Sequence, residues 1–317
     1  MKLSFIIIGK NEGKTLKMCI DSIDLVINKY KYDYEIIYVD SKSKDNSLEI
    51  CNSNNIKTYK ITGDCNAAIA RNIGALESKG NILCFLDADM EIEVDFIDSI
   101  LNNNKLIHPF VSGQLKNLFY DENWNYLSED YLHKNLNKDS YQYTTGGYFI
   151  INREAWFLVN GMKTKFRRSQ DIDFGLRLSN IGIPLLRKNR LFVKHHTIAY
   201  NDKSRMWKML FDGSNLYSNS LIIREHLFNK FLYPSFLRKY YSLLVLFFCI
   251  IISITSGNIL PIIFYLFFMC IKVSKQKIST NYLNQLINQI LIDFTSLIGL
   301  IIFHPKNKNE KYIKEKS

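Results

Sequence analysis

The sequence predicts an α/β domain with a mostly parallel, doubly wound sheet flanked by helices, followed by a hydrophobic helical segment. Two observations carry this prediction. Short apolar runs alternate with amphipathic stretches over residues 1–215, and long apolar runs with almost no charge follow Tyr240. Strands that alternate with helices over short connections are typical of a parallel sheet, because each crossover returns the chain to the same edge.

The first strand is predicted at residues 3–8, a continuous apolar run that Gly9 ends. Continuous apolar runs are typical of parallel strands that are buried on both faces. Six further elements follow, in the order helix, strand, helix, strand, helix and strand. The helices are expected at about residues 14–28, in a segment that ends at Cys51, and at 66–78, and the strands are expected at 34–39, 56–61 and 82–86.

Polar residues follow the ends of three of these strands. Asn11 comes after the first strand, Asp40 after the second, and Asp87 and Asp89 after the last. Ligands of doubly wound sheets bind beyond the carboxyl ends of the strands, so we expect these side chains along one edge.

Residues 114–143 have a different composition, rich in Tyr, Trp and Asn, and their periodicity is weak. No strand or helix is predicted there. The aromatic side chains of this stretch either stack on a sugar or pack a long loop, and the sequence does not decide between the two. Residues 145–156, TGGYFIINREAW, predict a turn, a strand and the start of a helix.

Two apolar runs, 241–256 and 259–271, predict a tight helical hairpin (residues 241–271) after an amphipathic connector at 216–240. Each run is shorter than the roughly 20 residues that cross a bilayer comfortably. The hairpin therefore either spans the membrane with distortion or enters and leaves on one face. Basic residues flank it on both sides, which places both flanks on the cytoplasmic side.

A third apolar stretch at residues 283–303 contains several polar side chains. If it crossed the membrane, the basic tail at 304–317 would lie outside, against the charge rule. We expect this stretch at the membrane interface or packed on the hairpin. The alternative for the whole region is a buried hydrophobic subdomain without lipid, which would have to bury long uncharged runs.

The net charge of +11 and the pI of about 9.2 indicate an anionic partner. Basic residues cluster at 163–168, at 187–194 and beside the apolar runs, which favours a phosphate-bearing substrate and a membrane surface. No nucleic-acid partner is expected, because no binding motif for one is recognisable. Six cysteines without a CxxC pair, and an N-terminal apolar run too short for a signal peptide, predict a cytoplasmic domain.

Asp87 and Asp89 are two carboxylates whose charges repel, at the expected ligand edge of the sheet. A divalent cation would cancel that repulsion. Mg²⁺ and Mn²⁺ take oxygen ligands from one or two carboxylates and from substrate phosphates, so such a cation would link the protein to a diphosphate. Acidic pairs also occur in ordinary turns, and the pair alone does not establish a metal site.

A second acidic cluster lies in SQDIDFGLRL, residues 169–178, which predicts the start of a helix. Asp171 or Asp173 could cap this helix. Asp171, which follows a basic loop, could instead accept a proton from a hydroxyl nucleophile as a general base. The cluster alone leaves both interpretations open.

Five segments of the sequence are informative when taken together and in order. The segments are IIIGKNEGKTLKMCIDSI, VDSKSKDNS, AIARNIGALESKGNILCFLDAD, TTGGYFIINREAWFLVNGM and QDIDFGLRL. In this order they resemble glycosyltransferase family 2, the inverting, nucleotide-sugar-dependent enzymes of the GT-A fold. The resemblance covers about residues 1–215 and implies a GT-A catalytic domain, which a membrane segment would follow.

The resemblance implies a donor site on the first three segments. Glu12, Asp40 and Arg71 match positions that hold the base, ribose and phosphates of the nucleotide. Asp87 matches the first aspartate of the family's DxD motif, near the ribose and the metal. Asp89 matches the aspartate that binds Mn²⁺ or Mg²⁺.

The resemblance also implies the remaining site residues. Asp171 matches the catalytic base, and Gly146, Gly147 and Gln170 lie on the acceptor side. A histidine on a later strand completes the metal site in many family members. RLFVKHHTIAY offers His195 and His196, of which we expect His195.

The sequence departs from the family pattern in three places. Gly9-Lys10 replaces the usual pair in the opening segment, which puts contacts with the base in doubt. Gln170 replaces the Glu that usually precedes the base, which puts its acceptor contact in doubt. No QxxRW motif is visible, so a single-transfer enzyme is expected rather than a polymerase.

The resemblance implies an inverting, metal-dependent glycosyltransferase on the cytoplasmic face of the membrane. UDP-sugars are the commonest donors in this family, and the apolar segments suggest a lipid-linked glycan or glycolipid acceptor in surface polysaccharide synthesis. Two alternatives stay open. A nucleotidyltransferase could use a similar sheet and paired aspartates, and a non-catalytic membrane scaffold could keep the fold without the chemistry.

Overall fold

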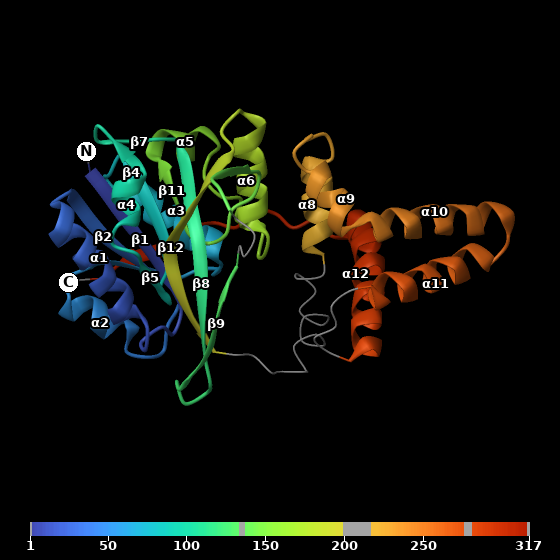
Figure 1. Ribbon diagram of the computed structural model, residues 1–317, viewed down its shortest axis with the longest axis horizontal. Coiled ribbons are helices and arrows are strands. Elements are labelled where there is room, and N and C mark those ends of the chain that lie inside the picture. The colour runs from blue at the N-terminus through green and yellow to red at the C-terminus, as the bar shows by residue number, and fades with distance from the viewer. Residues whose placement is uncertain (1, 133–136, 199–216, 276–280, 316–317) are drawn as a thin grey trace. The chain divides into compact units, whose positions relative to one another are not determined.

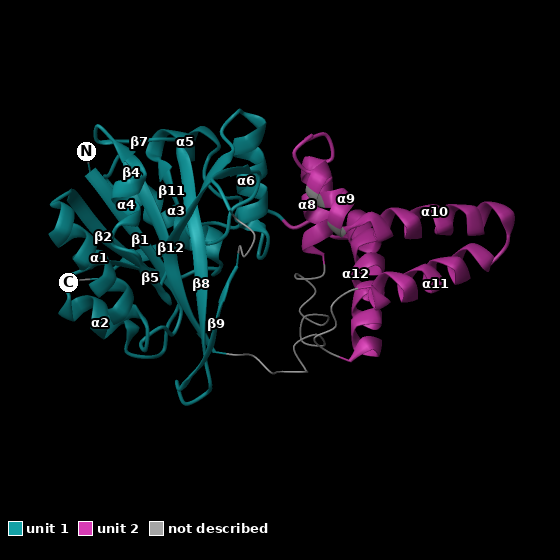
Figure 2. Ribbon diagram, viewed as in Figure 1, with its two compact units in different colours: residues 1–201, 306–317 teal, residues 202–305 magenta. Residues whose placement is uncertain are grey.

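The computed structural model describes residues 2–132, 137–198, 217–275 and 281–315 of the chain, and Figure 1 shows their course. The chain forms two compact units (Figure 2). Unit 1 comprises residues 1–201 and 306–317, and unit 2 comprises residues 202–305. In sequence, unit 2 is therefore an insertion between two parts of unit 1.

The first half of the sheet in unit 1 is parallel. Its strands are β1 (Lys2–Gly9), β2 (Asp33–Asp40), β3 (Lys57–Ile61) and β4 (Ile82–Asp87). The helices between them are α1 (Leu16–Tyr30), α2 (Ser47–Ser53) and α3 (Ala67–Glu77). β1 lies between β2 and β4, and β3 lies beside β2. The predicted alternation of strand and helix is confirmed here.

The second half of the sheet is mixed. Its strands are β5 (Met90–Ile92), β8 (Phe110–Tyr120), β9 (Tyr126–Tyr131), β10 (Ser140–Gln142), β11 (Phe149–Asn152) and β12 (Leu185–Ile198). β8 and β12 run parallel, and the other pairings in this half are antiparallel. Smaller elements are α4 (Phe96–Ser99), β6 (Leu101–Asn102), β7 (Lys105–Leu106), α5 (Arg153–Leu158) and α6 (Gln170–Asn180).

Residues 114–143, where the sequence predicts no regular element, contribute most of β8 and all of β9 and β10. Strands therefore form where one of the two open interpretations had a long loop. Every side chain of β9 except Asp130 is exposed, and β8 is half-buried from Lys116 onward. Because neither face is consistently buried, these strands lack the alternating apolar pattern that reveals a strand in a sequence.

Helices cover both faces of the sheet (Figure 1), and alternate residues of β1 point to opposite faces. Phe5 and Ile7 pack with buried residues of α1. Ile6 packs on the other face with residues of α3, α5 and α6. At Gly74 of α3, a Cβ atom would come within 2.2 Å of Ile6 Cγ2, so glycine permits this close approach. Burial on both faces explains the continuous apolar run of the first strand.

The last residues of the chain return to unit 1 and extend its sheet. β13 (Tyr312–Lys314) pairs antiparallel with β3 at the sheet edge. The Tyr312 hydroxyl donates a hydrogen bond of 2.6 Å to Glu77 Oε1 at the end of α3. The sequence indicates only a basic tail at 304–317, because a three-residue strand is too short to produce a recognisable period.

Unit 2 is helical. Among its described residues, the helices are α8 (Ser218–His226), α9 (Tyr233–Lys239), α10 (Tyr241–Ser256), α11 (Leu260–Ser274) and α12 (Tyr282–Ile302). α10 and α11 form a hairpin that turns at Gly257, whose φ of 65° favours glycine. Leu246 and Cys249 of α10 pack against Tyr265 and Met269 of α11, and α12 packs beside them.

The hairpin exposes apolar side chains over most of its length. Ile254 and Ile259, near its turn, are 76% and 67% exposed. Within the described residues, α12 is the one helix long and apolar enough to cross a bilayer, judged by length and composition alone. α10 and α11 are shorter apolar helices of 16 and 15 residues. The hairpin thus presents an apolar surface that no described part of unit 2 covers.

Candidate active site

Arg71 and Asp87 form an ion pair at the carboxyl end of β4. Arg71 Nη2, from α3, lies 2.7 Å from Asp87 Oδ1, and Arg71 is only 2% exposed. The same nitrogen donates to the carbonyl oxygen of Gly147 at 3.1 Å. Arg71 is therefore held beneath Asp87, and its charge-assisted hydrogen bond fixes the position of that carboxylate.

Gly147 lets the segment before β11 approach this ion pair. A Cβ atom on Gly147 would come within 2.7 Å of both Arg71 Nη2 and Asp87 Oδ2. A Cβ atom on Gly146 would instead meet the Tyr148 ring at 2.9 Å. The structure thus brings Gly147, a residue expected on the acceptor side, directly against Asp87.

Asp89 and His195 form a second pair beside the first. His195 Nε2, from β12, lies 3.0 Å from Asp89 Oδ2, and His195 Nδ1 lies 2.8 Å from Asn117 Oδ1 on β8. Burial lowers the pKa of His195, but the hydrogen bond and charge of Asp89 outweigh burial and leave the pKa raised. Asp89 Oδ1 is buried and has no hydrogen-bond partner among the described residues.

His196 points elsewhere, because adjacent residues of a strand face opposite sides. Its Nε2 lies 3.3 Å from Glu91 Oε2, and its Nδ1 lies 3.0 Å from the Tyr120 hydroxyl. Between the two histidines that the sequence offers, the structure places His195 against Asp89.

Glu12 follows β1 and lies near both aspartates. Burial, together with the negative charges of Asp89 and Asp87, raises the pKa of Glu12 to about 7, although Thr15 Oγ1 donates to Glu12 Oε2 at 3.1 Å. Glu12 thus shares one electrostatic environment with the two aspartates. This concentration of negative charge favours a cation.

Asp40 ends β2 and is fully buried. Its Oδ2 accepts a hydrogen bond of 3.0 Å from the Ser43 backbone N–H, so it holds the following turn. The Asn11 backbone N–H donates to Ser43 Oγ at 2.8 Å, and the Gly13 N–H donates to Asp45 Oδ2 at 2.8 Å. Asp40 therefore supports a turn that is tied to the loop after β1.

Asp171 lies in the first turn of α6 and is half-buried. Gly175 follows one turn later on the same helix face, where a Cβ atom would come within 2.6 Å of the Tyr143 carbonyl oxygen. The face of α6 that carries Asp171 therefore packs on the segment leading to Gly147. Gln170 Oε1 is buried without a hydrogen-bond partner among the described residues.

Asp173 has a structural role that distinguishes it from Asp171. It is fully buried, and its Oδ2 lies 2.8 Å from Arg177 Nη2. Lys163, from the basic loop before α6, lies 3.7 Å from Asp173 Oδ1. Asp173 thus joins α6 to the loop, and it forms an ion pair rather than the cap that the sequence also allowed.

Sequence reasoning missed several residues that support the site. Asn117 orients His195, but it lies on a strand with no recognisable pattern. Ser43 and Asp45 hold the loop after β1, and they belong to the polar turn SKSKDNS, which could have suggested such hydrogen bonds.

The residues of this site fit a divalent cation that only a few protein side chains would hold. Among the described residues, no cluster of three or more His, Cys, Asp and Glu side chains is arranged to hold a metal ion. Asp89 and His195 form a pair, and Asp89 Oδ1 lacks a partner. Mg²⁺ and Mn²⁺ sites often use one or two protein ligands and complete their shell with water and substrate phosphate.

The chain is similar to solved structures of another protein. It matches the crystal structure of S. aureus TarS 1-349 with a TM-score of 0.53 and 15% identity, covering 73% of this chain and 66% of that chain. It matches the same protein in complex with UDP-GlcNAc with a TM-score of 0.54 and 16% identity, covering 73% and 68%. At this level of identity, the likeness establishes the fold.

Two curated relatives come from Streptococcus pneumoniae serotype 4 (strain ATCC BAA-334 / TIGR4). Glycosyltransferase GlyA is 31% identical over 103 residues, and Glycosyltransferase GlyG is 30% identical over 95 residues. These alignments cover 31% and 28% of this chain, and 14% and 31% of the relatives' own lengths.

The family model described as Glycosyl transferase family 2 matches residues 4–171, a stretch that contains the Arg71–Asp87 and Asp89 positions and ends on Asp171. The match extends over more than half of the 317 residues. The chain therefore belongs to glycosyl transferase family 2.

Proposed function

We propose that the protein is an inverting glycosyltransferase that moves a sugar from a nucleotide-sugar to an acceptor hydroxyl. One observation supports this most directly: in a family 2 chain, the Arg71–Asp87 and Asp89–His195 pairs lie side by side at the carboxyl end of β4. Carboxylates fixed at a strand end can bind the ribose hydroxyls of a donor directly and its diphosphate through a divalent cation.

The donor is proposed to be a UDP-sugar. TarS has been crystallised with UDP-GlcNAc and with UDP, and this chain has its fold. We assign the contacts with the base and ribose to Glu12 and to the turn held by Asp40. Arg71, which is buried, acts on the donor through Asp87 by holding that carboxylate in place.

Asp89 and His195 would hold Mn²⁺ or Mg²⁺ together with oxygens of the donor diphosphate. When bound, the cation supplies positive charge beside the leaving diphosphate. The chain itself contributes the geometry, because Asn117 orients His195 and the His196 backbone N–H donates to the Asp89 carbonyl oxygen at 2.9 Å. Glu12 adds negative charge that favours cation binding.

Asp171 is proposed as the general base. Its carboxylate accepts the proton of the acceptor hydroxyl while that oxygen attacks the anomeric carbon, and the bond to the nucleoside diphosphate breaks on the opposite face. A single displacement of this kind inverts the anomeric configuration. The face of α6 that carries Asp171 packs on the Tyr143–Gly147 segment, which leads to Asp87.

A thermal-shift experiment tests the donor site, because a ligand that binds the folded state raises its apparent stability. We expect UDP with Mn²⁺ to raise the unfolding temperature more than UDP or Mn²⁺ alone. Asp89→Asn should abolish the part of this rise in unfolding temperature that depends on Mn²⁺. Asp95→Asn is the matched control, because Asp95 is an exposed acid paired with Lys29. An equal shift in wild type and Asp89→Asn would contradict the metal site.

Mass spectrometry of the products tests the reaction itself. Transfer of a sugar supports the proposal, whereas transfer of a nucleotide would identify a nucleotidyltransferase. Asp171→Asn should abolish product while the UDP-dependent thermal shift stays, because Asp171 is assigned to the acceptor. If cells that carry Asp89→Asn or Asp171→Asn both kept their glycan, the protein would be a non-catalytic scaffold.

The acceptor is proposed to be a lipid-linked glycan or glycolipid in surface polysaccharide synthesis, at the cytoplasmic face of the membrane. The exposed apolar surface of α10 and α11, and the apolar length of α12, support this. Full-length protein, membranes and a radiolabelled UDP-sugar should give label that organic solvent extracts. Label confined to water-soluble product would contradict a lipid acceptor.

A further inference from the structure

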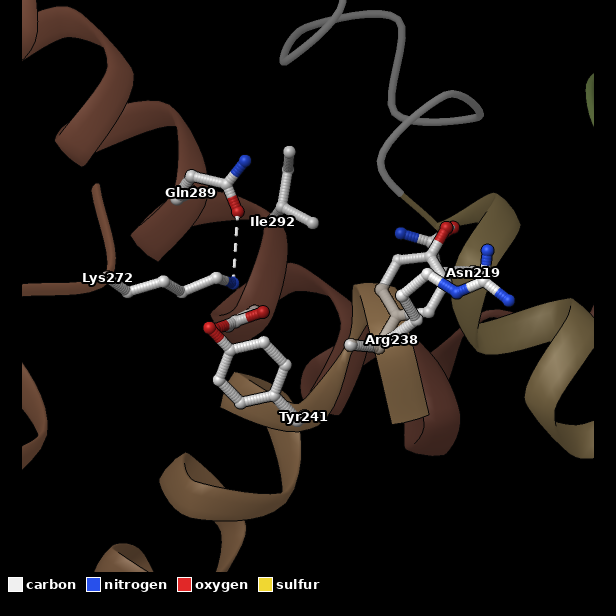
Figure 3. Close-up of a pocket in the computed structure, with 8 residues that line it drawn as sticks. Asn219, Arg238, Tyr241, Lys272, Gln289 and Ile292 are labelled. Atoms are coloured by element: carbon white, nitrogen blue, oxygen red, sulfur yellow. Dashed lines mark hydrogen bonds between the residues drawn. The ribbon is translucent and has the colours of Figure 1, made fainter. Parts of the chain in front are cut away.

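Unit 2 contains a polar cavity of about 440 Å³ in an otherwise apolar helical assembly. Residues of α8, α9, α10, α11 and α12 line it, and Figure 3 shows their arrangement. Tyr241 begins α10, and Lys272 lies in the last turn of α11, so both mark the end of the hairpin opposite its turn. The cavity therefore lies at the base of the hairpin.

Lys272 is a buried cation that Asp293, the acid of the cavity lining, attracts electrostatically without a direct contact. It is 8% exposed, and its ammonium donates to Ser242 Oγ at 2.7 Å and to Gln289 Oε1 at 3.4 Å. The ammonium also lies 4.9 Å from the centre of the Tyr241 ring. Among the described residues, no carboxylate oxygen lies within 4.0 Å of it. A buried charge is costly unless it is closely paired, and Asp293 attracts Lys272 only from beyond that distance, so this position favours an added anion.

The other charged residues of the cavity leave an excess of positive charge. Asp293 is buried, and its Oδ2 accepts a hydrogen bond of 2.9 Å from the Tyr265 hydroxyl. Arg238 is exposed at the cavity and forms no ion pair with any described residue. Two cations, Arg238 and Lys272, therefore face one acid, Asp293, among the residues that line the cavity.

The hairpin beyond the cavity has the dimensions of a membrane-inserted segment. Sixteen residues of α10 rise about 24 Å at 1.5 Å per residue, which is less than the roughly 30 Å hydrocarbon core. With the exposed apolar tip in hydrocarbon, the base of the hairpin lies at the depth of lipid headgroups. Figure 1 shows α12 crossing that base, where it packs on both hairpin helices.

We propose that this cavity binds the phosphate of an anionic membrane lipid, with Lys272 and Arg238 as its cationic contacts. The phosphate adds negative charge to a lining in which Lys272 and Arg238 face the single carboxylate of Asp293, and the lipid chains lie along the exposed apolar side chains of α10 and α11. The proposal is independent of sugar transfer, and it holds or fails on lipid binding alone.

Native mass spectrometry of the full-length protein in a non-ionic detergent tests the proposal. The probes are phosphatidylglycerol, diacylglycerol with the same acyl chains, and inorganic phosphate. We expect wild-type protein to retain phosphatidylglycerol in preference to diacylglycerol. Arg238→Gln should lower retention about fivefold, because one basic residue near a membrane surface contributes about that factor.

Lys230→Gln is the matched control. Lys230 is exposed in the same unit, undergoes the same charge change, and does not line the cavity. It should leave retention unchanged. An equal loss in Lys230→Gln would show general surface attraction and overturn the cavity assignment.

Three other results would also overturn the proposal. Equal retention of the two lipids would show apolar contact alone. Displacement of the lipid by millimolar inorganic phosphate, with phosphate retained in its place, would identify a soluble ligand. If Lys272→Gln retained phosphatidylglycerol fully, and its unfolding temperature showed that it is folded, Lys272 would be excluded as a contact of the phosphate.

Discussion

His195 Nε2 lies 3.0 Å from Asp89 Oδ2, whereas the next residue, His196, turns its ring toward Glu91 and Tyr120. Strand geometry causes this division of roles, because successive side chains of β12 point to opposite faces. Two adjacent histidines that look equivalent in the sequence are thus distinct in the fold.

We expect His195→Gln to weaken the response to Mn²⁺ and to lower the transfer rate roughly 100-fold, on the scale seen for changes around metal sites. His196→Gln should keep the metal response and lose some stability, because His196 is buried between two partners. Transfer rates measured over a Mn²⁺ titration, with unfolding temperatures for both variants, check this. The reverse pattern would move the metal site to His196.

The pH dependence of stability should reveal Glu12. Its pKa is raised from 4.5 to about 7, so the folded chain binds this proton more tightly than the unfolded chain. The resulting stabilisation is full below about pH 4.5 and is lost as the pH rises through 7. Glu12→Gln stays neutral, so above pH 7 it should be more stable than wild type by roughly 1–2 kcal/mol, after allowance for solvent screening.

Denaturant unfolding of wild type and Glu12→Gln at several pH values between 4 and 8 measures this difference. If the free energies of unfolding of the two proteins changed with pH in parallel, the pKa of Glu12 would not be raised. Mn²⁺ with UDP should shrink the difference between the two proteins, because added positive charge offsets the repulsion between Glu12 and the aspartates.

Gly147→Ala should damage the site because its new methyl group would meet Arg71 and Asp87 at 2.7 Å. We expect a loss of about 1–3 kcal/mol in stability, the usual range for overpacking, and a transfer rate at least tenfold lower. Gly146→Ala is the comparison, because its methyl group would meet the Tyr148 ring instead. Equal transfer rates for the two variants would show that contact with the ion pair does not matter.

Tyr312→Phe should destabilise unit 1 by about 1–2 kcal/mol, since it removes a hydrogen bond to the Glu77 carboxylate. Tyr126→Phe is the matched control, because its hydroxyl bonds to Glu129 at the exposed surface of β9. We expect that control to change stability by less than about 0.5 kcal/mol. Denaturant unfolding measures both, and equal effects would show that β13 adds little.

Much of the fold was predictable because its signals are local. The continuous apolar run of β1 follows from burial on both faces, and the acids after β2 and β4 mark the ligand edge without any long-range knowledge. Asp87, Asp89 and Asp171 could be proposed as site residues for the same reason, because their motifs lie within single segments.

The remaining features depend on contacts that the sequence does not display. The pairing of Asn117 with His195 joins two strands that lie far apart in the chain, and β8 shows no alternating pattern because its second half is not buried on one face. The position of Arg71 beneath Asp87, rather than at the surface, depends on how closely Gly147 packs.

The return of β13 to β3 has a consequence for biosynthesis. The ribosome makes the residues of unit 2 before it makes Tyr312–Lys314, so the edge strand of the sheet emerges only after unit 2. Until then β3 presents unpaired backbone groups, a known template for unwanted strand pairing. The edge of the sheet in unit 1 therefore stays open for as long as the ribosome is making unit 2.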